Sequence, residues 1–327
     1  DMEFKDRRCN STLLMSLLTA LNRGKELIIG EPGMGKTTTA EYVCALFYRL
    51  PLETVWRSSV AGHPEQTEEK IVGRPDLGQL NRGTEVVRWS YFALMPTKIV
   101  DELNRLPETK QSLILDGVDR GKWEYLNTAV FNSEFCFFAT ANYADRGTNT
   151  IVTPLMDRFD IMVESKHPGA NLAYRIGVQD HNGYVLCDSD VEADIHRILT
   201  SSSSYARQMD QLEDVSTRFG HSLKKKLGVQ TLSKRERQEA WSQIQKIDFD
   251  LDANAFLRLI IAELSFCYHH GQKRSLEECD SGCHFTGYLC HAVKNCISNR
   301  FAMSVQLFAQ AFAWLFGDQQ VSLNHLT

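Results

Sequence analysis

Residues 27–38 read Leu-Ile-Ile-Gly-Glu-Pro-Gly-Met-Gly-Lys-Thr-Thr, and this stretch decides the fold of the chain. A short apolar run leads into a glycine-rich turn and then into apolar residues at helical spacing, which predicts a buried strand, a loop and a helix. Gly30, four further residues and then Gly35-Lys36-Thr37 fit the P-loop pattern, in which backbone N–H groups at a helix N-terminus face phosphates. The flanking strand and helix make an ordinary glycine-rich turn the weaker interpretation.

The loop predicts a nucleotide site with a role for each residue type. Lys36 would meet the β and γ phosphates, and Thr37 would hold Mg²⁺. A side chain at Gly33 or Gly35 would block either a positive φ or the close approach of backbone to phosphate. We expect these residues to contact the nucleotide: Gly30, Pro32, Gly33, Met34, Gly35, Lys36, Thr37 and Thr38.

Length and composition describe a globular protein. The 327 residues suggest about two domains, and hydrophobic residues make up 43% of the chain. No uninterrupted apolar stretch approaches the roughly 18–20 residues that span a bilayer, and residues 1–8 are too charged for a secretory signal. We therefore expect a cytoplasmic protein. The formal net charge of −5 argues against broad nucleic-acid binding, which usually needs a basic surplus.

A second chemical feature follows the apolar run that begins at Met95. The run delivers Asp101 and Glu102 at its C-terminal end. Asp101 would bind the Mg²⁺ shell, and Glu102 would polarise a water for attack on the γ phosphate. Two adjacent acids are also common before helices, but the P-loop makes the catalytic interpretation the better one.

Two more polar residues follow apolar strands. Residues 135–141 are wholly apolar apart from one threonine, which predicts the centre of a parallel sheet covered on both faces. Asn142 ends this strand, and its amide would bond the attacking water or the γ phosphate; alternatively it is a turn residue. Arg158 follows a helix end before a last strand, where it could also be a surface cation.

The remaining segments are less specific. We expect a strand over 55–60 and a hairpin over 85–92 beside the site. Residues 168–230 read as a poorly constrained insertion or linker with charged helices over 191–199 and 209–223, and Lys224–Lys226 as a solvated face. Beyond Ser233 the pattern predicts helices over 234–247, 252–268, 287–297 and 298–317.

At this point the motifs together resemble the MoxR-type AAA+ ATPases in their archaeal form. The resemblance is carried by Asp101-Glu-Leu-Asn-Arg-Leu-Pro-Glu-Thr-Lys-Gln, Ala139-Thr-Ala-Asn, Gly147-Thr, Leu155-Met-Asp-Arg-Phe and the stretch that begins Ile297-Ser-Asn-Arg-Phe. Their order after the P-loop is that of Walker B, sensor 1, arginine finger and sensor 2. The resemblance covers about 1–167 and 231–327.

The resemblance implies an α/β fold: an AAA+ P-loop αβα core with a parallel five-strand sheet over 1–167, an insertion over 168–230 and a small helical lid over 231–327. It also implies that Arg158 reaches the γ phosphate of a neighbouring subunit and that Arg300 senses nucleotide from the lid. Lys36, Thr37, Asp101, Glu102 and Asn142 would serve ATP within one subunit. A ring, usually a hexamer, then becomes part of the mechanism.

The implied function is ATP-driven remodelling of a protein partner, commonly one of the von Willebrand factor A type. Two alternatives stay open. One is a DNA-associated motor, since minichromosome-maintenance helicases share the same AAA+ branch, and the other is a nucleotide-switched scaffold. The sequence departs from the family at Tyr143, where the family has proline, and in the insertion over 168–230.

Five of the nine cysteines fall between Cys267 and Cys296. Cys279 and Cys283 have the separation of a zinc knuckle in a polar loop, which favours a structural zinc over core packing. His270 or His284 could replace an outer cysteine. The predicted zinc ligands are Cys267, Cys279, Cys283 and Cys290. Cys44 and Cys136, by contrast, suit the role of small apolar core residues.

Overall fold

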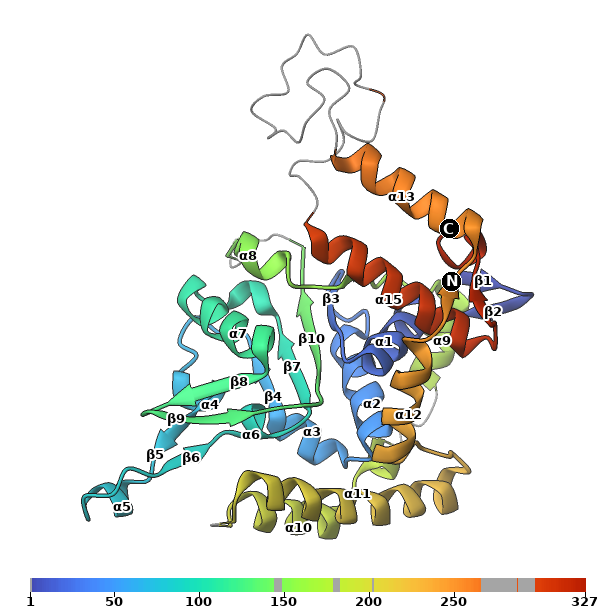
Figure 1. Ribbon diagram of the computed structural model, residues 1–327. Helices are drawn as coiled ribbons and strands as arrows, with labels where there is room; N and C mark the ends of the chain where they lie inside the picture. The colour runs from blue at the N-terminus through green and yellow to red at the C-terminus, as the bar shows by residue number, and fades with distance from the viewer. Residues whose placement is uncertain (1, 144–148, 179–182, 202, 266–286, 288–297) are drawn as a thin grey trace. The chain divides into compact units, whose positions relative to one another are not determined.

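The computed structural model describes residues 2–143, 149–178, 183–201, 203–265, 287 and 298–327. The chain divides into two compact units, Asp1–Gln238 and Glu239–Thr327 (Figure 1). In the part that the structure describes, no helix combines the length and apolar character needed to cross a membrane.

A five-stranded parallel sheet forms the centre of the first unit. Its strands lie in the order β11-β3-β10-β7-β4, and every neighbouring pair is parallel. The strands are β3 Lys25–Ile29, β4 Ser59–Ala61, β7 Thr97–Asp101, β10 Cys136–Ala141 and β11 Ile161–Glu164. Every residue of β10 is buried, as predicted for a central strand covered on both faces. The carboxyl ends of the parallel strands therefore meet at one edge, where the predicted site residues follow.

Helices cover both faces of this sheet (Figure 1). On one face lie α1 Ser11–Asn22 and α2 Lys36–Tyr48. On the other lies α7 Glu108–Arg120, whose Ile114 and Val118 pack with Leu27 and Phe137 in one buried cluster. Shorter helices complete the layers: α3 Leu52–Ser58, α4 Glu68–Ile71, α6 Tyr91–Leu94 and α8 Thr153–Met156. The expected αβα core is thus confirmed.

Three antiparallel ribbons extend from the first unit. They are β1 Met2–Phe4 with β2 Arg7–Cys9, β5 Gly73–Pro75 with β6 Val87–Trp89, and β8 Lys122–Tyr125 with β9 Thr128–Phe131. The hairpin predicted over 85–92 is wrong in extent, because β6 pairs with the upstream strand β5 across α5 Leu77–Leu80 and the chain turns helical at Tyr91. Ser90 caps that helix with its hydroxyl, which accepts from the N–H of Ala93 at 3.0 Å.

The strand predicted over 55–60 is also mostly wrong. Residues Leu52–Ser58 form α3, and only Ser59–Ala61 form β4. Leu52 and Val55, spaced by three residues, bury one helical face. The hydroxyls of Ser58 and Ser59 both donate to the Val55 carbonyl, at 2.9 and 2.8 Å, and so close the last helical turn.

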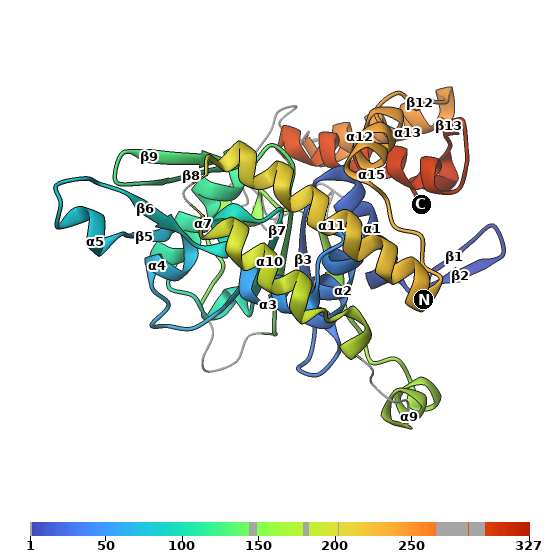
Figure 2. The ribbon, with the colours of Figure 1, turned by 90° about the horizontal axis from the view of Figure 1, so that it is seen from below.

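Residues 168–230 are not the poorly constrained linker that we expected. They include α9 Ala170–Val178, a 3-10 turn at Gly183–Leu186, α10 Ser189–Leu199 and α11 Tyr205–Leu227. Figure 2 shows α10 and α11 side by side. Leu212, Phe219 and Leu223 of α11 are buried, and Glu213 pairs with Arg49 at the end of α2. These long-range contacts anchor both helices to the first unit. Lys224–Lys226 are exposed, as predicted.

The second unit is small and mainly helical. It contains most of α12 Lys234–Ile244, then β12 Asp248–Phe249, α13 Leu251–Ser265, α15 Asn299–Leu315, β13 Gln320–Val321 and a 3-10 turn at Leu323–His325. Its core gathers Ile247, Ala253, Ala309, Ala313 and Val321. The helix predicted over 234–247 ends early because Asp248 and Phe249 pair in parallel with Gln320 and Val321. Most of the helix predicted over 287–297 lies outside the described residues.

Candidate functional site

The loop between β3 and α2 has the shape of a phosphate cradle. Gly30 has φ +153, and a Cβ there would lie 2.4 Å from the Ser165 carbonyl oxygen, so only glycine fits beside β11. Gly33 and Gly35 have φ of +80 and +75, and a Cβ on either would meet no atom within 4 Å. The loop therefore curves around open space at the N-terminus of α2. Because the first N–H groups of a helix lack intrahelical partners, this end attracts anions.

The Lys36 side chain is hydrogen-bonded to the backbone of its own loop. Its ammonium donates to the carbonyl oxygens of Gly30 and Glu31 at 2.9 and 2.8 Å and to Asn142 Oδ1 at 2.9 Å. Burial lowers the pKa of Lys36, while the charges of Asp101, Glu102 and Glu31 act in the opposite direction. The P-loop lysine is thus in direct contact with Asn142, the amide that follows β10.

Asp101 lies at the carboxyl end of β7 and receives two hydroxyl groups on one oxygen. Thr37 Oγ1 donates to Asp101 Oδ1 at 2.5 Å, and Thr140 Oγ1 donates to the same oxygen at 2.6 Å. A carboxylate beside a threonine hydroxyl is the oxygen donor set that Mg²⁺ prefers next to phosphates. The residues present therefore fit Mg²⁺, which Thr37 and Asp101 would hold.

Glu102 is held in an unusual backbone conformation. Its φ of 51° and ψ of 51° lie in the left-handed region, which a non-glycine residue adopts at a cost of about 1–2 kcal/mol. Its N–H donates to Thr140 Oγ1 at 2.9 Å. Asn142 Nδ2 donates to Glu102 Oε1 at 2.7 Å, and Arg105 Nε lies 3.0 Å from Glu102 Oε2. Both carboxylate oxygens are therefore oriented by neighbours.

These residues share one cavity of about 250 Å³, lined by residues 32–38 with Asp101, Glu102, Thr140 and Asn142. The sequence predicted all of them as one site except Thr140. A hydroxyl inside an otherwise apolar strand, two residues before Asn142, was the available signal for it. Gly62 was missed as well: its N–H donates to the Asp101 carbonyl at 2.6 Å, and a Cβ would lie 2.0 Å from the Glu102 carbonyl oxygen.

The backbone of Asn142 is also held by a hydrogen bond. Asn104 Nδ2 donates to the Asn142 carbonyl at 3.0 Å. Tyr143, where the resembled family has proline, donates its hydroxyl to Glu164 of β11. The loss of proline is thus accompanied by a side-chain link between the end of β10 and its neighbour strand.

Other predicted site residues lie outside this cavity. Arg158 follows α8 and is partly exposed; its Nε lies 3.3 Å from Asp119 Oδ1, and Nη1 donates to the Pro154 carbonyl at 3.1 Å. Arg300 is the second residue of α15, in the second unit. The stretch Gly147-Thr148 lies outside the described residues.

The four cysteines predicted to bind zinc, Cys267, Cys279, Cys283 and Cys290, also lie outside the described residues. Within the described ranges, no group of three or more His, Cys, Asp or Glu side chains could hold a metal ion. Cys44 and Cys136 are buried with their sulfur atoms 3.9 Å apart. They belong to the core, as predicted.

Comparison with known proteins extends the same interpretation. Residues 25–159 match the family model of the AAA domain, dynein-related subfamily. The chain also resembles a crystal structure of a "putative ATPase" from Cytophaga hutchinsonii, with a TM-score of 0.60 and 17% sequence identity over 96% of this chain and 77% of that chain. A likeness at this identity shows a shared fold alone. No curated protein matches the chain.

Proposed function

We propose that the AAA+ ATPase domain over residues 25–159 makes this chain a remodelling factor, which hydrolyses ATP in a ring and acts on a protein partner in the cytoplasm. One observation carries the ATPase assignment. The P-loop residues Lys36 and Thr37 bond directly to Asn142 and Asp101, so that the phosphate cradle and the residues after two neighbouring strands form one site.

Each side chain has a role in hydrolysis. The N–H groups at the start of α2 and the Lys36 ammonium bind the phosphates. Thr37 and Asp101 hold Mg²⁺, which when bound neutralises phosphate charge. Glu102 accepts a proton from the attacking water, and Asn142 fixes the direction of the Glu102 carboxylate through its 2.7 Å hydrogen bond.

Within the AAA+ ATPases, we assign the chain to the MoxR type in its archaeal form. Residues 1–167 are then the core, 168–230 an insertion and 231–327 the lid. Arg158 then acts on the γ phosphate of a neighbouring subunit, where an arginine finger contributes about 10³–10⁵ in rate. Arg158 is partly exposed and lies outside the nucleotide cavity of its own chain, which suits contact with the nucleotide of a neighbouring subunit. Arg300 senses nucleotide from the lid, and the ring is a hexamer.

A protein partner, of the von Willebrand factor A type, is supported by helix α9 in the insertion. Its apolar side chains Leu172, Tyr174, Ile176 and Val178 are all exposed, with Tyr174 72% accessible. Leu172 with Ile176, and Tyr174 with Val178, are four residues apart, so each pair offers an apolar surface on its own side of the helix, which favours contact with a protein. The net charge of −5 favours a protein over a nucleic acid as the partner.

A DNA-associated motor is the second candidate, because two antiparallel ribbons, β5–β6 and β8–β9, extend from the core. DNA that stimulates ATP turnover, with stimulation lost steeply as salt rises, would favour it. Turnover that DNA leaves unchanged at low salt would exclude this candidate.

A dilution series tests the proposed function. ATP turnover per chain is expected to rise with protein concentration and to follow the appearance of rings in native mass spectrometry. Constant turnover per chain in a purely monomeric sample would contradict a ring-dependent ATPase. Rings with negligible turnover would instead indicate a nucleotide-switched scaffold.

We further propose that Cys267, Cys279, Cys283 and Cys290 bind one structural zinc. Purified protein is expected to hold about one zinc per chain after exhaustive buffer exchange, and C279S is expected to lower this content. Protein without zinc after expression in zinc-supplemented medium would rule the site out.

A further inference from the structure

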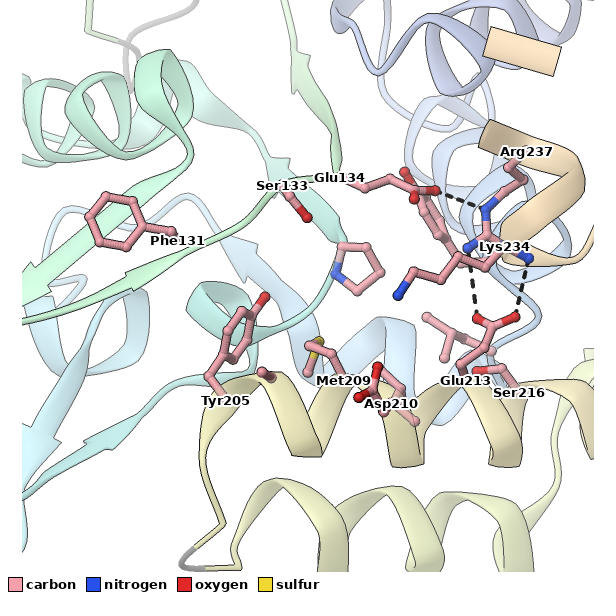
Figure 3. A pocket seen from close by; sticks show the side chains of 15 residues that line it. Phe131, Ser133, Glu134, Tyr205, Met209, Asp210, Glu213, Ser216, Lys234 and Arg237 are labelled. Carbon is pink, nitrogen blue, oxygen red and sulfur yellow. Dashed lines mark hydrogen bonds and ion pairs between the residues drawn. The ribbon is translucent and has the colours of Figure 1, made fainter. Parts of the chain in front are cut away.

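A second cavity, of about 360 Å³, is shown with its lining residues in Figure 3. Pro96 precedes β7 and Glu134 precedes β10, so the cavity opens at the amino ends of these strands. The five residues of β7 separate the two edges by about 16 Å. All lining residues belong to the first unit, and none lines the nucleotide cavity.

Three charged residues that line this cavity, Glu134, Glu213 and Arg237, are already paired. Arg237 Nε donates to Glu134 Oε1 at 2.9 Å, and its Nη2 lies 3.9 Å from Glu213 Oε2. The Arg237 guanidinium also lies 5.1 Å from the centre of the Tyr48 ring. Glu213 pairs in addition with Arg49. Arg23 Nη2 also lies 3.9 Å from Glu134 Oε2, so three arginines pair with two carboxylates and every member of this network already has a partner.

Lys234 is different. Its backbone N–H donates to Glu213 Oε1 at 3.1 Å, but its ammonium makes no hydrogen bond or ion pair with any residue that the structure describes. Figure 3 shows the side chain extending among the drawn residues rather than toward the paired charges. Lys234 is half-buried, and a cation beside apolar walls gains from an anionic partner.

The remaining wall is largely apolar. Leu50, Pro96, Phe131, Met209 and Leu212 contribute hydrocarbon surface, while the Tyr205 hydroxyl is occupied by Asn132 and the Leu94 carbonyl. Asp210 also lines the cavity, and its side chain is exposed. Closely packed interiors leave few voids larger than a water molecule, whereas small-molecule sites measure about 300–1,000 Å³ and combine apolar walls with a few polar groups.

We propose that this cavity binds a small amphiphilic carboxylate, a single anionic group on an apolar chain or ring, with the Lys234 ammonium as the partner of the anion. The apolar body of the ligand lies against Met209, Leu212 and Pro96. This site is separate from the nucleotide cavity, and the inference does not rest on the proposed function.

Isothermal titration of the full chain with octanoate, and with octan-1-ol as the neutral match, tests this site. K234Q is expected to weaken octanoate binding roughly tenfold and to leave octanol unchanged, since it removes only the charge–carboxylate interaction. M209W fills the cavity and should weaken both probes. K225Q, on the exposed face of α11, is the matched control and should bind like the parent chain.

Three results would overturn the proposal: no octanoate binding by the parent chain at millimolar concentration, equal octanoate affinity in K234Q and the parent, or octanoate binding unchanged by M209W. K234Q should remain folded, because the Lys234 ammonium bonds no described residue and glutamine keeps the backbone N–H. Circular dichroism melting checks this, and M209W tests the location even if K234Q is unstable.

Discussion

The Thr140 hydroxyl donates to Asp101 across neighbouring strands, with 2.6 Å between Thr140 Oγ1 and Asp101 Oδ1. Thr140 Oγ1 in turn accepts the N–H of Glu102 at 2.9 Å. Thr140 is fully buried in β10. One hydroxyl therefore positions the proposed Mg²⁺ ligand and stabilises the left-handed backbone of the proposed base.

T140V should lower ATP turnover by about tenfold or more, because valine keeps the shape of threonine but removes both hydrogen bonds. T140S keeps the hydroxyl and should retain most activity. Steady-state kinetics with a Mg²⁺ titration provides the measurement: a positioning role predicts a lower kcat and a higher Mg²⁺ requirement. If T140V kept the parent kcat and Mg²⁺ dependence, the proposed role of Thr140 would be wrong.

E102Q should bind ATP about as tightly as the parent and lose turnover by about 10²–10⁴, since the amide cannot accept the proton of the attacking water. Glutamine can still accept from Asn142 Nδ2, so the local geometry is kept. E108Q, at the exposed start of α7, is the control and should turn over normally. Unchanged turnover in E102Q would remove Glu102 from the role of base.

The grouping of the candidate site residues could be predicted because most of its signals are local. Gly30 through Thr38 form one continuous pattern. Asp101, Glu102 and Asn142 each lie at the carboxyl end of a strand or just beyond it, where parallel topology gathers them at one edge. Thr140 was not predictable in the same way, because its value depends on the pairing of β10 with β7. The sequence shows a threonine in a strand, and only the register places its hydroxyl beside Asp101.

Two other features could not be predicted from the sequence for the same reason. Lys98 sits in β7, where a charge usually indicates an exposed face, yet it is fully buried because its ammonium donates to the carbonyl oxygens of Phe92, Ala93 and Met95 at the end of α6. Glu213 lies in a charged helix within the segment that we interpreted as an insertion or linker. Its partner Arg49 is 164 residues away in the sequence. Partners this distant in sequence decide burial, and hydropathy patterns do not record them.

Glu26 should make stability fall as pH rises. Burial raises its pKa from 4.5 to about 8, and the neighbouring hydroxyls of Thr19 and Ser16 act in the opposite direction. Among the described residues, Glu26 Oε2 has no hydrogen-bond partner. The raised pKa means that the folded chain holds this proton more tightly than the unfolded chain does. The contribution of Glu26 to the free energy of unfolding is therefore fully present below pH 4.5 and is lost as the pH rises to about 8. The loss is at most about 1.4 kcal/mol per pH unit.

E26Q removes this titration and should flatten the pH dependence. Differential scanning calorimetry at pH 6 and pH 8.5 is expected to show a Tm of the parent that drops more than that of E26Q. E31Q, in the exposed P-loop, is the control and should follow the parent. Parallel Tm profiles for the parent and E26Q would contradict a protonated Glu26 in the folded chain.

Arg158 should act on the site of a neighbour, and mixing two inactive variants tests this directly. K36A lacks the phosphate-binding ammonium but keeps Arg158, whereas R158A keeps its own nucleotide site. Each alone should lose at least about 10³ in turnover if the arginine finger is as important as in related chemistry. In a randomly mixed ring, roughly a quarter of the interfaces would join an intact Lys36 to an intact Arg158 in trans. Mixing should therefore restore activity.

The stability of R158A separates this role from a structural one. The ion pair of Arg158 with Asp119, at 3.3 Å, is partly exposed and stabilises the fold by only about 0–1 kcal/mol. The Tm of R158A should therefore stay near that of the parent. R120A, at the end of the same α7 that carries Asp119, is the control and should remain active. Mixed rings of K36A and R158A, verified by native mass spectrometry, that stayed inactive would show that Arg158 does not complete a neighbouring site.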